Sequence, residues 1–463
     1  MQAVADPIDP TIFRAYDIRG IVGDTLTHNA VRAIGRAFAS MVQETVSGAP
    51  RIAVGYDGRL SSPEIEDALV SGLNDGGADV VSVGLGPTPM LYFAVHHLGT
   101  DAGIMVTGSH NPPDYNGVKM MLGHGPFHGD QILEVARRTQ HDARAEQRGT
   151  FERADIRQDY VARLLADLVP GRELNVVWDA GNGAAGEILD AVVARLPGRH
   201  TVLFSEIDGN FPNHHPDPTV PENLEDITRV VVEQGADLGI AFDGDGDRIG
   251  VIDGQGAVLW GDQLMTLWAA DVLRERPGAT IIADVKASQV LFDEIARMGG
   301  EPLMWRTGHS LIKQKMKEIG CPLAGEMSGH VFFADHYYGF DDALYASIRL
   351  LNVLAAGDEN LADIRKRFPV VTNTPEMRFD CDDVRKFAVI DEVRARLADR
   401  GDDVVDVDGV RVSVAGGWWL LRASNTQPVL VARCEATDET ALDLVKQDLL
   451  SAVSPSGIVP PNF

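Results

Sequence analysis

A serine in a short polar loop is the first candidate for chemistry. Residues 102–106 form an apolar run that predicts a buried strand, and Ser109 follows it in the sequence TGSHNPPDYNGVKM. Ligands of open α/β sheets bind at the carboxyl ends of strands, where this serine would lie. His110, Asn111 and Lys119 add an imidazole, an amide and a cation. Such a hydroxyl could be a nucleophile or carry a phosphoryl group, although a lone serine there is more often part of an ordinary turn.

Three aspartates alternate with glycines in the distant sequence FDGDGDRIG. The glycines let the backbone curl, so Asp243, Asp245 and Asp247 can converge on one hard cation, and Arg248 suits a phosphoryl oxygen. An EF-hand is excluded, because Arg248 stands where that loop needs glycine and Gly254 where it needs glutamate. A solvated acidic turn is the structural alternative. Three carboxylates without a full cage suit Mg²⁺, and a phosphorylated serine would supply the missing ligand.

These motifs resemble the α-D-phosphohexomutases, most closely the bacterial phosphomannomutase/phosphoglucomutase branch. The resemblance begins at FRAYDIRG and ends at RASNTQP, so it covers nearly the whole chain. Four motifs match in order, which is far more specific than any one of them. The resemblance implies an isomerase that carries phosphate on Ser109, binds one Mg²⁺ through Ser109 and the three aspartates, and uses glucose or mannose 1,6-bisphosphate as activator and intermediate.

The resemblance also assigns roles to residues that are unremarkable by themselves. It places Tyr16 and Arg19 of FRAYDIRG in the active site near the phosphoserine, where a surface loop with salt bridges would otherwise be expected. It lets Lys286, at the end of a predicted strand, and His309 of RTGHSLIK contact the phosphosugar. Both of these residues offer nitrogen donors.

The hexapeptide GEMSGH places Glu326, Ser328 and His330 on alternate positions. Alternate residues of an extended segment point the same way, and a carboxylate beside a hydroxyl suits two adjacent sugar hydroxyls. A polar turn is the alternative for so short a motif. The resemblance makes it the sugar-selecting loop, and its form is similar to the mannose/glucose branch rather than the phosphoglucosamine branch.

The sequence RASNTQP gathers a guanidinium, two hydroxyls and an amide in one loop. Arg422, Ser424, Asn425 and Thr426 are together the donor set of a phosphate clamp. A solvated hairpin tip would not need all four. We therefore expect this loop to hold the phosphate group that is not being transferred.

The elements that must position these residues recur along the chain. A strand at residues 51–56, a helix with Ser62 as N-cap, and a strand at residues 80–83 form the first unit. Similar strand–helix–strand openings begin at residues 174–178 and 280–283. The sequence therefore predicts three related α/β domains.

The pattern changes after about residue 368. Strands at residues 404–407 and 410–414 flank an Asp-Gly turn, and a helix over residues 440–453 closes the chain, which indicates an α+β domain. We expect four domains around a central cleft: 1–153 with the phosphoserine loop, 154–256 with the metal loop, 257–368 with the sugar loop, and 369–463 with the phosphate clamp.

Composition restricts partners and compartment. A formal net charge of −27 over 463 residues argues against nucleic acid and anionic membranes, so phosphate binding requires a local cationic pocket. The three scattered cysteines form no metal spacing or disulfide framework, and no apolar run approaches the length of a membrane span. The N-terminal residues do not resemble a signal peptide. We expect a cytoplasmic monomer whose partner is a small phosphosugar.

The predicted reaction interconverts hexose 1-phosphate and hexose 6-phosphate of mannose, glucose or both. Phosphorylated Ser109 would give its phosphoryl group to the free sugar hydroxyl, with Mg²⁺ and Arg248 stabilising it, and recover the other phosphoryl group after the bisphosphate turns around. His110, Lys119 and His330 are the candidate acids or bases. The alternatives are a phosphoglucosamine mutase, a Mg-dependent sugar phosphatase, or an acidic protein that only binds Mg²⁺ or Ca²⁺.

Overall fold

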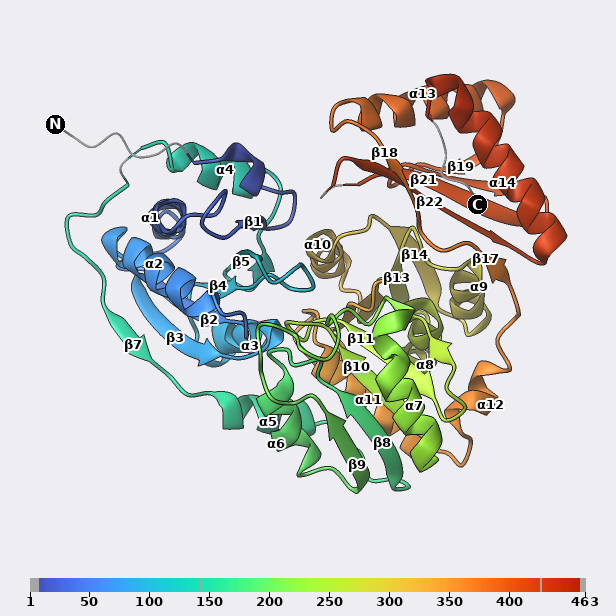
Figure 1. Cartoon of the computed structure of the whole chain (residues 1–463), viewed down its shortest axis with the longest axis horizontal. Coiled ribbons are helices and arrows are strands. Elements are labelled where there is room, and N and C mark those ends of the chain that lie inside the picture. Colours follow the sequence, from blue (N-terminus) through green and yellow to red (C-terminus); the bar gives the residue numbers. More distant parts are fainter. Residues whose placement is uncertain (1–7, 142, 425–426, 459–463) are drawn as a thin grey trace.

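The structure is a computed structural model that describes residues 8–141, 143–424 and 427–458. Its strands form four separate sheets, which follow one another along the chain and pack against helices (Figure 1). The first three sheets mix parallel and antiparallel pairs, whereas the described strands of the fourth are antiparallel throughout. The predicted fold class, three α/β units and a C-terminal α+β unit, is confirmed.

The first sheet is covered on both faces and leads directly into the Ser109 loop. Along β4, Ile104 and Val106 enter a core formed with α1 and α2, while Met105 between them enters the opposite core. This alternation is the period of two of a strand, and it explains why every residue of β4 is buried. The elements are β1 (Ile18–Ile21), α1 (His28–Gln43), β2 (Arg51–Tyr56), α2 (Ser62–Asp75), β3 (Asp79–Leu85), α3 (Thr88–His97), β4 (Ala102–Val106), β5 (Tyr115–Leu122), β6 (Gly125–Pro126), α4 (Asp130–Arg138) and β7 (Phe151–Arg153).

The second and third units share one hydrophobic core, which also takes in helix α3 of the first unit. Trp178, Trp268 and Phe333 are among its large side chains, and all three are buried. Burial of apolar side chains from three units in one core fixes their relative positions, since separating them would expose this surface to water.

The second unit contains β8 (Leu174–Asp179), β9 (Gly198–Leu203), β10 (Leu238–Phe242), β11 (Ile249–Asp253), β12 (Val258–Leu259), α5 (Arg157–Leu165), α6 (Gly186–Val193) and α7 (Glu225–Gln234). The third contains α8 (Gly261–Glu275), β13 (Thr280–Asp284), α9 (Gln289–Arg297), β14 (Glu301–Trp305), α10 (His309–Ile319), β15 (Leu323–Gly325), β16 (Val331–Phe333), α11 (Ala343–Ala355) and α12 (Leu361–Arg365). In both, the strand that precedes the functional loop lies inside the sheet.

The fourth unit has its own core and a separate contact with the third. Trp419 lies in the domain core, whereas Trp418 packs with Leu420 against Val285 of the third unit. Both tryptophans are buried. The elements are β17 (Thr372–Asn373), β18 (Met377–Asp380), α13 (Arg385–Arg400), β19 (Asp403–Val405), β20 (Val410–Val414), β21 (Gly417–Ala423), β22 (Val429–Ala436) and α14 (Glu439–Val453).

Two local expectations need correction. The predicted N-cap Ser62 is already the first residue of α2, and Ser61 precedes the helix without a side-chain capping bond. The hydroxyl of Ser62 instead donates to Asp57 Oδ1 at 2.5 Å, so a tertiary partner competes with the cap. The hairpin predicted around Asp408 and Gly409 exists, but β19 ends at Val405, which makes the loop longer than a two-residue turn.

The described part of the chain has neither a membrane-spanning helix nor a disulfide bond. No helix there combines the length and the apolar character needed to cross a membrane. Cys321, Cys381 and Cys434 are all free and buried.

Candidate active site

Ser109 occupies a strained position at the end of β4. Its φ of 50° lies in the left-handed region, which costs a non-glycine residue about 1–2 kcal/mol. The backbone is held there because Ser109 N donates to Thr107 Oγ1 at 2.8 Å and Gly108 N donates to Asp57 Oδ2 at 3.0 Å. Only 2% of Ser109 is exposed. Strain that the surrounding bonds maintain is characteristic of functional loops.

A buried arginine, which the sequence analysis missed, fastens this loop. The Arg59 guanidinium donates to the carbonyl oxygens of Ser109, Asn111, Pro112 and Tyr115 at 2.5–3.0 Å. Its Nε lies 3.4 Å from Asp57 Oδ2. The position of Arg59, just after the strand that neighbours β4, was the available signal, because carboxyl ends of parallel strands meet at one edge.

Replacement of Arg59 by Lys should reduce kcat about tenfold or more. Lysine keeps the charge beside Asp57 but has no planar fork to reach four carbonyl groups, so the serine loop loses its fixed geometry. Steady-state kinetics and thermal unfolding should be measured together, with Arg153→Lys in the same domain as control. An unchanged kcat in Arg59→Lys would show that the loop does not depend on this arginine.

The aspartate loop lies directly opposite the serine. Asp243, Asp245 and Asp247 are fully buried in the turn between β10 and β11, and one carboxylate oxygen from each lies within 4.8 Å of the others. Ser109 Oγ is 3.3 Å from Asp243 Oδ2. Lys119 Nζ lies 2.7 Å from Asp245 Oδ2 and 2.5 Å from Asp247 Oδ2. The two stretches that the sequence singled out therefore form one cluster.

The chemistry of this cluster fits a hard divalent cation. Burial and the charges of Asp247 and Asp245 raise the pKa of Asp243 well above its ordinary value. The cations around the three carboxylates therefore do not neutralise their negative charge. Among the described residues, the buried Oδ1 atoms of Asp245 and Asp247 have no hydrogen-bond partner. Mg²⁺ prefers oxygen ligands, which this cluster offers. The ion would also bind the unsatisfied buried oxygens and neutralise the excess negative charge.

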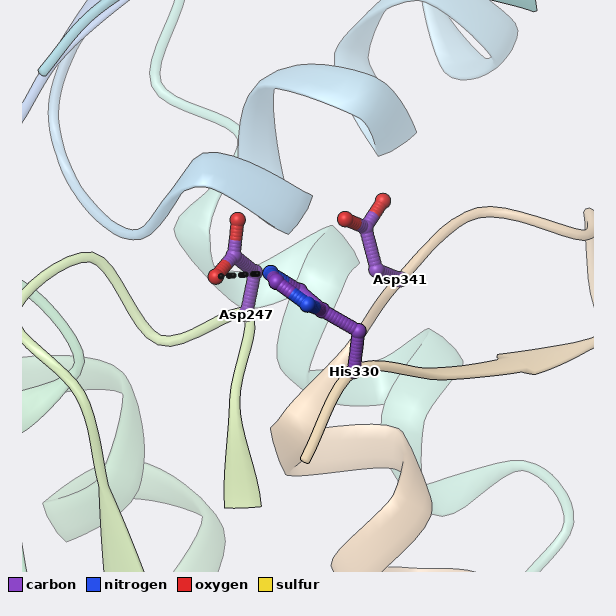
Figure 2. Close-up of side chains that lie close together, drawn as sticks. All are labelled: Asp247, His330 and Asp341. Atoms are coloured by element: carbon purple, nitrogen blue, oxygen red, sulfur yellow. Dashed lines mark ion pairs between the residues drawn. The ribbon is translucent and has the colours of Figure 1, made fainter. Parts of the chain in front are cut away.

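The predicted sugar loop reaches the aspartates through His330. His330 Nε2 lies 3.3 Å from Asp247 Oδ1 (Figure 2), and His330 Nδ1 lies 2.8 Å from Glu326 Oε2. Burial alone would lower the pKa of His330, but Asp247 and Glu326 outweigh it and raise that pKa to about 9. Ser328 Oγ is 3.1 Å from His330 Nδ1. All three predicted residues of this loop thus lie in one hydrogen-bonded group.

His110 is the imidazole nearest the serine. Its Nδ1 lies 3.2 Å from Ser109 Oγ, and burial, assisted by Arg248 and Arg19, lowers the pKa of His110 well below its ordinary value. His215 Nε2 lies 2.5 Å from the carbonyl oxygen of His110 and anchors it to the second domain. Sequence reasoning gave no role to His215. His110 is therefore neutral near pH 7 and able to accept a proton.

Two further predicted residues connect the first and third domains. The Tyr16 hydroxyl donates to the carbonyl oxygen of Thr307 at 2.9 Å, and the ring of Tyr16 meets His309 edge-on at 6.2 Å between centroids. Lys286 Nζ lies 3.4 Å from Glu376 Oε2, so it points to the junction with the fourth domain. These residues surround the cluster without contacting Ser109 through any described bond.

The predicted phosphate clamp is only partly described. Arg422 Nε donates to Asp408 Oδ2 at 2.9 Å, and Asp408 also accepts from Thr307 N, which joins the fourth domain to the third. The carbonyl oxygen of Ser424 accepts from Lys386 Nζ at 2.6 Å. Asn425 and Thr426 lie outside the described residues.

The cations of the site are paired with acids, which differs from the expected cationic pocket. Arg19 pairs with Asp17, Lys119 with Asp245 and Asp247, Lys286 with Glu376, and Arg422 with Asp408. The excess of acidic residues supplies a carboxylate for each cation. A bound phosphate must therefore compete with these carboxylates for the same donors.

Four consecutive segments of the chain match the four domains of one protein family. Residues 10–146, 158–256 and 260–371 match phosphoglucomutase/phosphomannomutase α/β/α domains I, II and III, and residues 376–452 match the C-terminal domain of that family. A phosphomannomutase/phosphoglucomutase of Pseudomonas syringae is 46% identical over 445 residues, which is 96% of this chain and 95% of the relative. A phosphoglucomutase of Neisseria gonorrhoeae is 44% identical over 439 residues, 94% of this chain and 95% of the relative.

A solved structure extends the similarity to three dimensions. A phosphoglucomutase/phosphomannomutase family protein from Burkholderia thailandensis superimposes with a TM-score of 0.92 at 44% identity, covering 98% of this chain and 100% of that one. All four domain matches occur in the family's order and leave few residues unmatched. The chain belongs to the phosphoglucomutase/phosphomannomutase family of isomerases.

Proposed function

We propose that this protein interconverts hexose 1-phosphate and hexose 6-phosphate of mannose, glucose or both, through a phosphoserine at Ser109 and a hexose 1,6-bisphosphate. The observation that carries the proposal is the 3.3 Å approach of Ser109 Oγ to Asp243 Oδ2 in a buried cluster of three aspartates. An unmodified serine hydroxyl beside three carboxylates has no evident chemical role. It becomes useful when it carries phosphate and completes the ligands of a cation.

In the proposed transfer, a sugar hydroxyl oxygen forms a bond to phosphorus while the bond from phosphorus to Ser109 Oγ breaks. Asp243, Asp245 and Asp247 would hold Mg²⁺, which supplies positive charge to the phosphoryl oxygens. Arg248, whose Nε lies 4.0 Å from Asp243 Oδ2, is placed to bind the same group. The hydroxyl proton passes to a base, and Ser109 Oγ ends as a hydroxyl once it has taken up a proton.

The positions and pKa shifts of Lys119, His110 and His330 favour the two histidines as acid and base. Burial would lower the pKa of Lys119, but Asp245 and Asp247 outweigh it and raise that pKa well above its ordinary value, so Lys119 keeps its proton. In the return step, in which the bisphosphate gives its other phosphoryl group to Ser109, the neutral His110, 3.2 Å from Ser109 Oγ, suits removal of the serine proton. His330, which Asp247 and Glu326 keep protonated, suits donation of a proton to the sugar oxygen that is released. We assign the two histidines these separate roles.

A substrate assay separates the proposed function from its alternatives. Glucose 1-phosphate and mannose 1-phosphate should be converted to their 6-phosphates, faster with catalytic amounts of the bisphosphate, because the bisphosphate restores phosphoserine. Release of inorganic phosphate at a comparable rate would instead indicate a phosphatase. Preference for glucosamine phosphate would indicate a phosphoglucosamine mutase, and no turnover of any of them would leave only a binding protein.

Replacement of Arg422 by Ala should raise KM about tenfold, roughly 1.4 kcal/mol of lost binding, with a smaller loss of kcat. We propose that Arg422 holds the phosphate distant from Ser109, and its removal leaves the serine chemistry untouched. Steady-state kinetics with both sugar phosphates measures this. Arg385→Ala, which removes a half-exposed arginine of the same domain paired with Glu392 on α13, is the control. Unchanged kinetics in Arg422→Ala would make the fourth domain a structural cover only.

A further inference from the structure

A second cluster of metal-ligating side chains lies beside the aspartate loop. Asp247, His330 and Asp341 face one another across the junction of the second and third domains (Figure 2), and one ligand atom of each lies within 4.8 Å of the others. His330 lies just before strand β16, and Asp341 lies after that strand, shortly before helix α11. All three side chains are buried. Only Asp247 belongs to the aspartate triad described above.

Each carboxylate of this second cluster turns an unsatisfied oxygen inward. Asp247 Oδ2 is bound by Lys119 and Asp341 Oδ1 by Lys313, at 2.5 and 2.7 Å. The remaining oxygens, Asp247 Oδ1 and Asp341 Oδ2, are buried and make no hydrogen bond among the described residues; they face the imidazoles of His330 and His309 at 3.3 and 3.4 Å. An unsatisfied buried polar atom costs about 1–3 kcal/mol, so a ligand that binds both oxygens would be stabilised.

The orientation of His330 is that of a metal ligand. Glu326 Oε2 holds Nδ1 at 2.8 Å, which directs Nε2 toward Asp247. Histidine ligands of metals almost always donate their other ring N–H to such a carboxylate, which fixes the tautomer and raises the basicity of the ligating nitrogen. Arg248 Nε lies 3.4 Å from Nε2 and must give way, since a metal would take the same lone pair.

We propose that Asp247, His330 and Asp341 form a zinc-binding site that shares only Asp247 with the aspartate triad. One imidazole and two carboxylates match zinc, whose ligand bonds of about 2.0 Å require the three atoms to move closer together than they are here. Mg²⁺ prefers oxygen ligands and retained water, so it favours the triad instead. The two sites therefore discriminate between metals by ligand type.

Occupation of this site should inhibit the enzyme. Zinc would engage Asp247, which the triad needs, and His330, which we assign to the sugar hydroxyl. Inhibition at micromolar zinc should therefore weaken as Mg²⁺ is raised, because both ions need Asp247. This consequence rests on the proposed function, but zinc binding itself does not, so failure of one is distinguishable from failure of the other.

The test is zinc binding to the full chain with Mg²⁺ in excess. X-ray absorption of the protein with one equivalent of zinc should show scattering from one imidazole. A chelator-competition titration should show a Kd at least about tenfold weaker in Asp341→Asn and His330→Gln. Asp179→Asn is the matched control, because Asp179 is a buried aspartate that contacts a histidine, His214, at 3.0 Å and should leave zinc affinity unchanged.

Other outcomes overturn the proposal. A zinc shell of oxygen atoms alone would place the ion at the aspartate triad. Imidazole scattering that survives in His330→Gln would place it on other histidines, such as the stacked pair His96 and His124. Unchanged affinity in Asp341→Asn would remove the third ligand. If circular dichroism shows that Asp341→Asn does not fold, the wild-type spectrum and His330→Gln decide.

Discussion

Replacement of Ser109 by Ala should lower kcat by about a thousandfold or more, which corresponds to roughly 4 kcal/mol of barrier. Alanine retains Cβ and the backbone bonds that hold the loop, and it removes only the oxygen that would carry phosphate. The described partners of that oxygen, His110 Nδ1 and Asp243 Oδ2, lie at 3.2 and 3.3 Å, so its loss costs little stability. The variant should therefore lose its activity and keep its fold.

The measurement combines turnover with protein mass. Incubation with glucose 1,6-bisphosphate should add one phosphoryl group to the wild-type chain and none to Ser109→Ala. Ser347→Ala is the control, because Ser347 is also a buried serine but donates only to a helix carbonyl group, that of Ala343. Near-normal turnover in Ser109→Ala, or phosphorylation of that variant at the same rate, would refute the phosphoserine mechanism.

Removal of Mg²⁺ should abolish turnover, and replacement of Asp243 by Asn should have nearly the same effect. The side-chain oxygen of Asn can still accept from the amides of Asp247 and Arg248, as Asp243 Oδ1 does at 3.1 Å, so the turn should survive. What disappears is one charged ligand. Activity should return to the chelated wild-type protein, but not to the variant, when Mg²⁺ is restored.

Thermal unfolding gives a second readout of the same prediction. Mg²⁺ at about one hundred times its Kd should stabilise the wild-type protein by about 2.7 kcal/mol, because it binds the native state alone. Asp243→Asn should lose most of this shift. Asp253→Asn, at a buried aspartate paired with Arg365 outside the cluster, should keep it. Full activity in excess chelator, or an unchanged Mg²⁺ shift in Asp243→Asn, would contradict the metal assignment.

Much of the architecture followed from local patterns. The apolar run before Ser109 predicted β4, and the recurring strand–helix–strand openings predicted three α/β units, because burial and periodicity are properties of contiguous residues. The alternation of aspartate and glycine predicted a turn that gathers carboxylates, which Asp243, Asp245 and Asp247 form. The cap at Ser62 was wrong because its hydroxyl found the distant Asp57 instead.

What the sequence alone determined is therefore the chemistry that each loop carries: a serine with an imidazole, three alternating carboxylates, a carboxylate beside a hydroxyl, and a guanidinium near the C-terminus. Only the tertiary structure decided which atoms meet. Arg59 at the serine loop, the pairing of Lys119 with two aspartates, and the approach of His330 and Asp341 to Asp247 join segments far apart in the chain. The physical reason is that burial and neighbouring charges set protonation and ligand geometry, and both depend on contacts that no local pattern encodes.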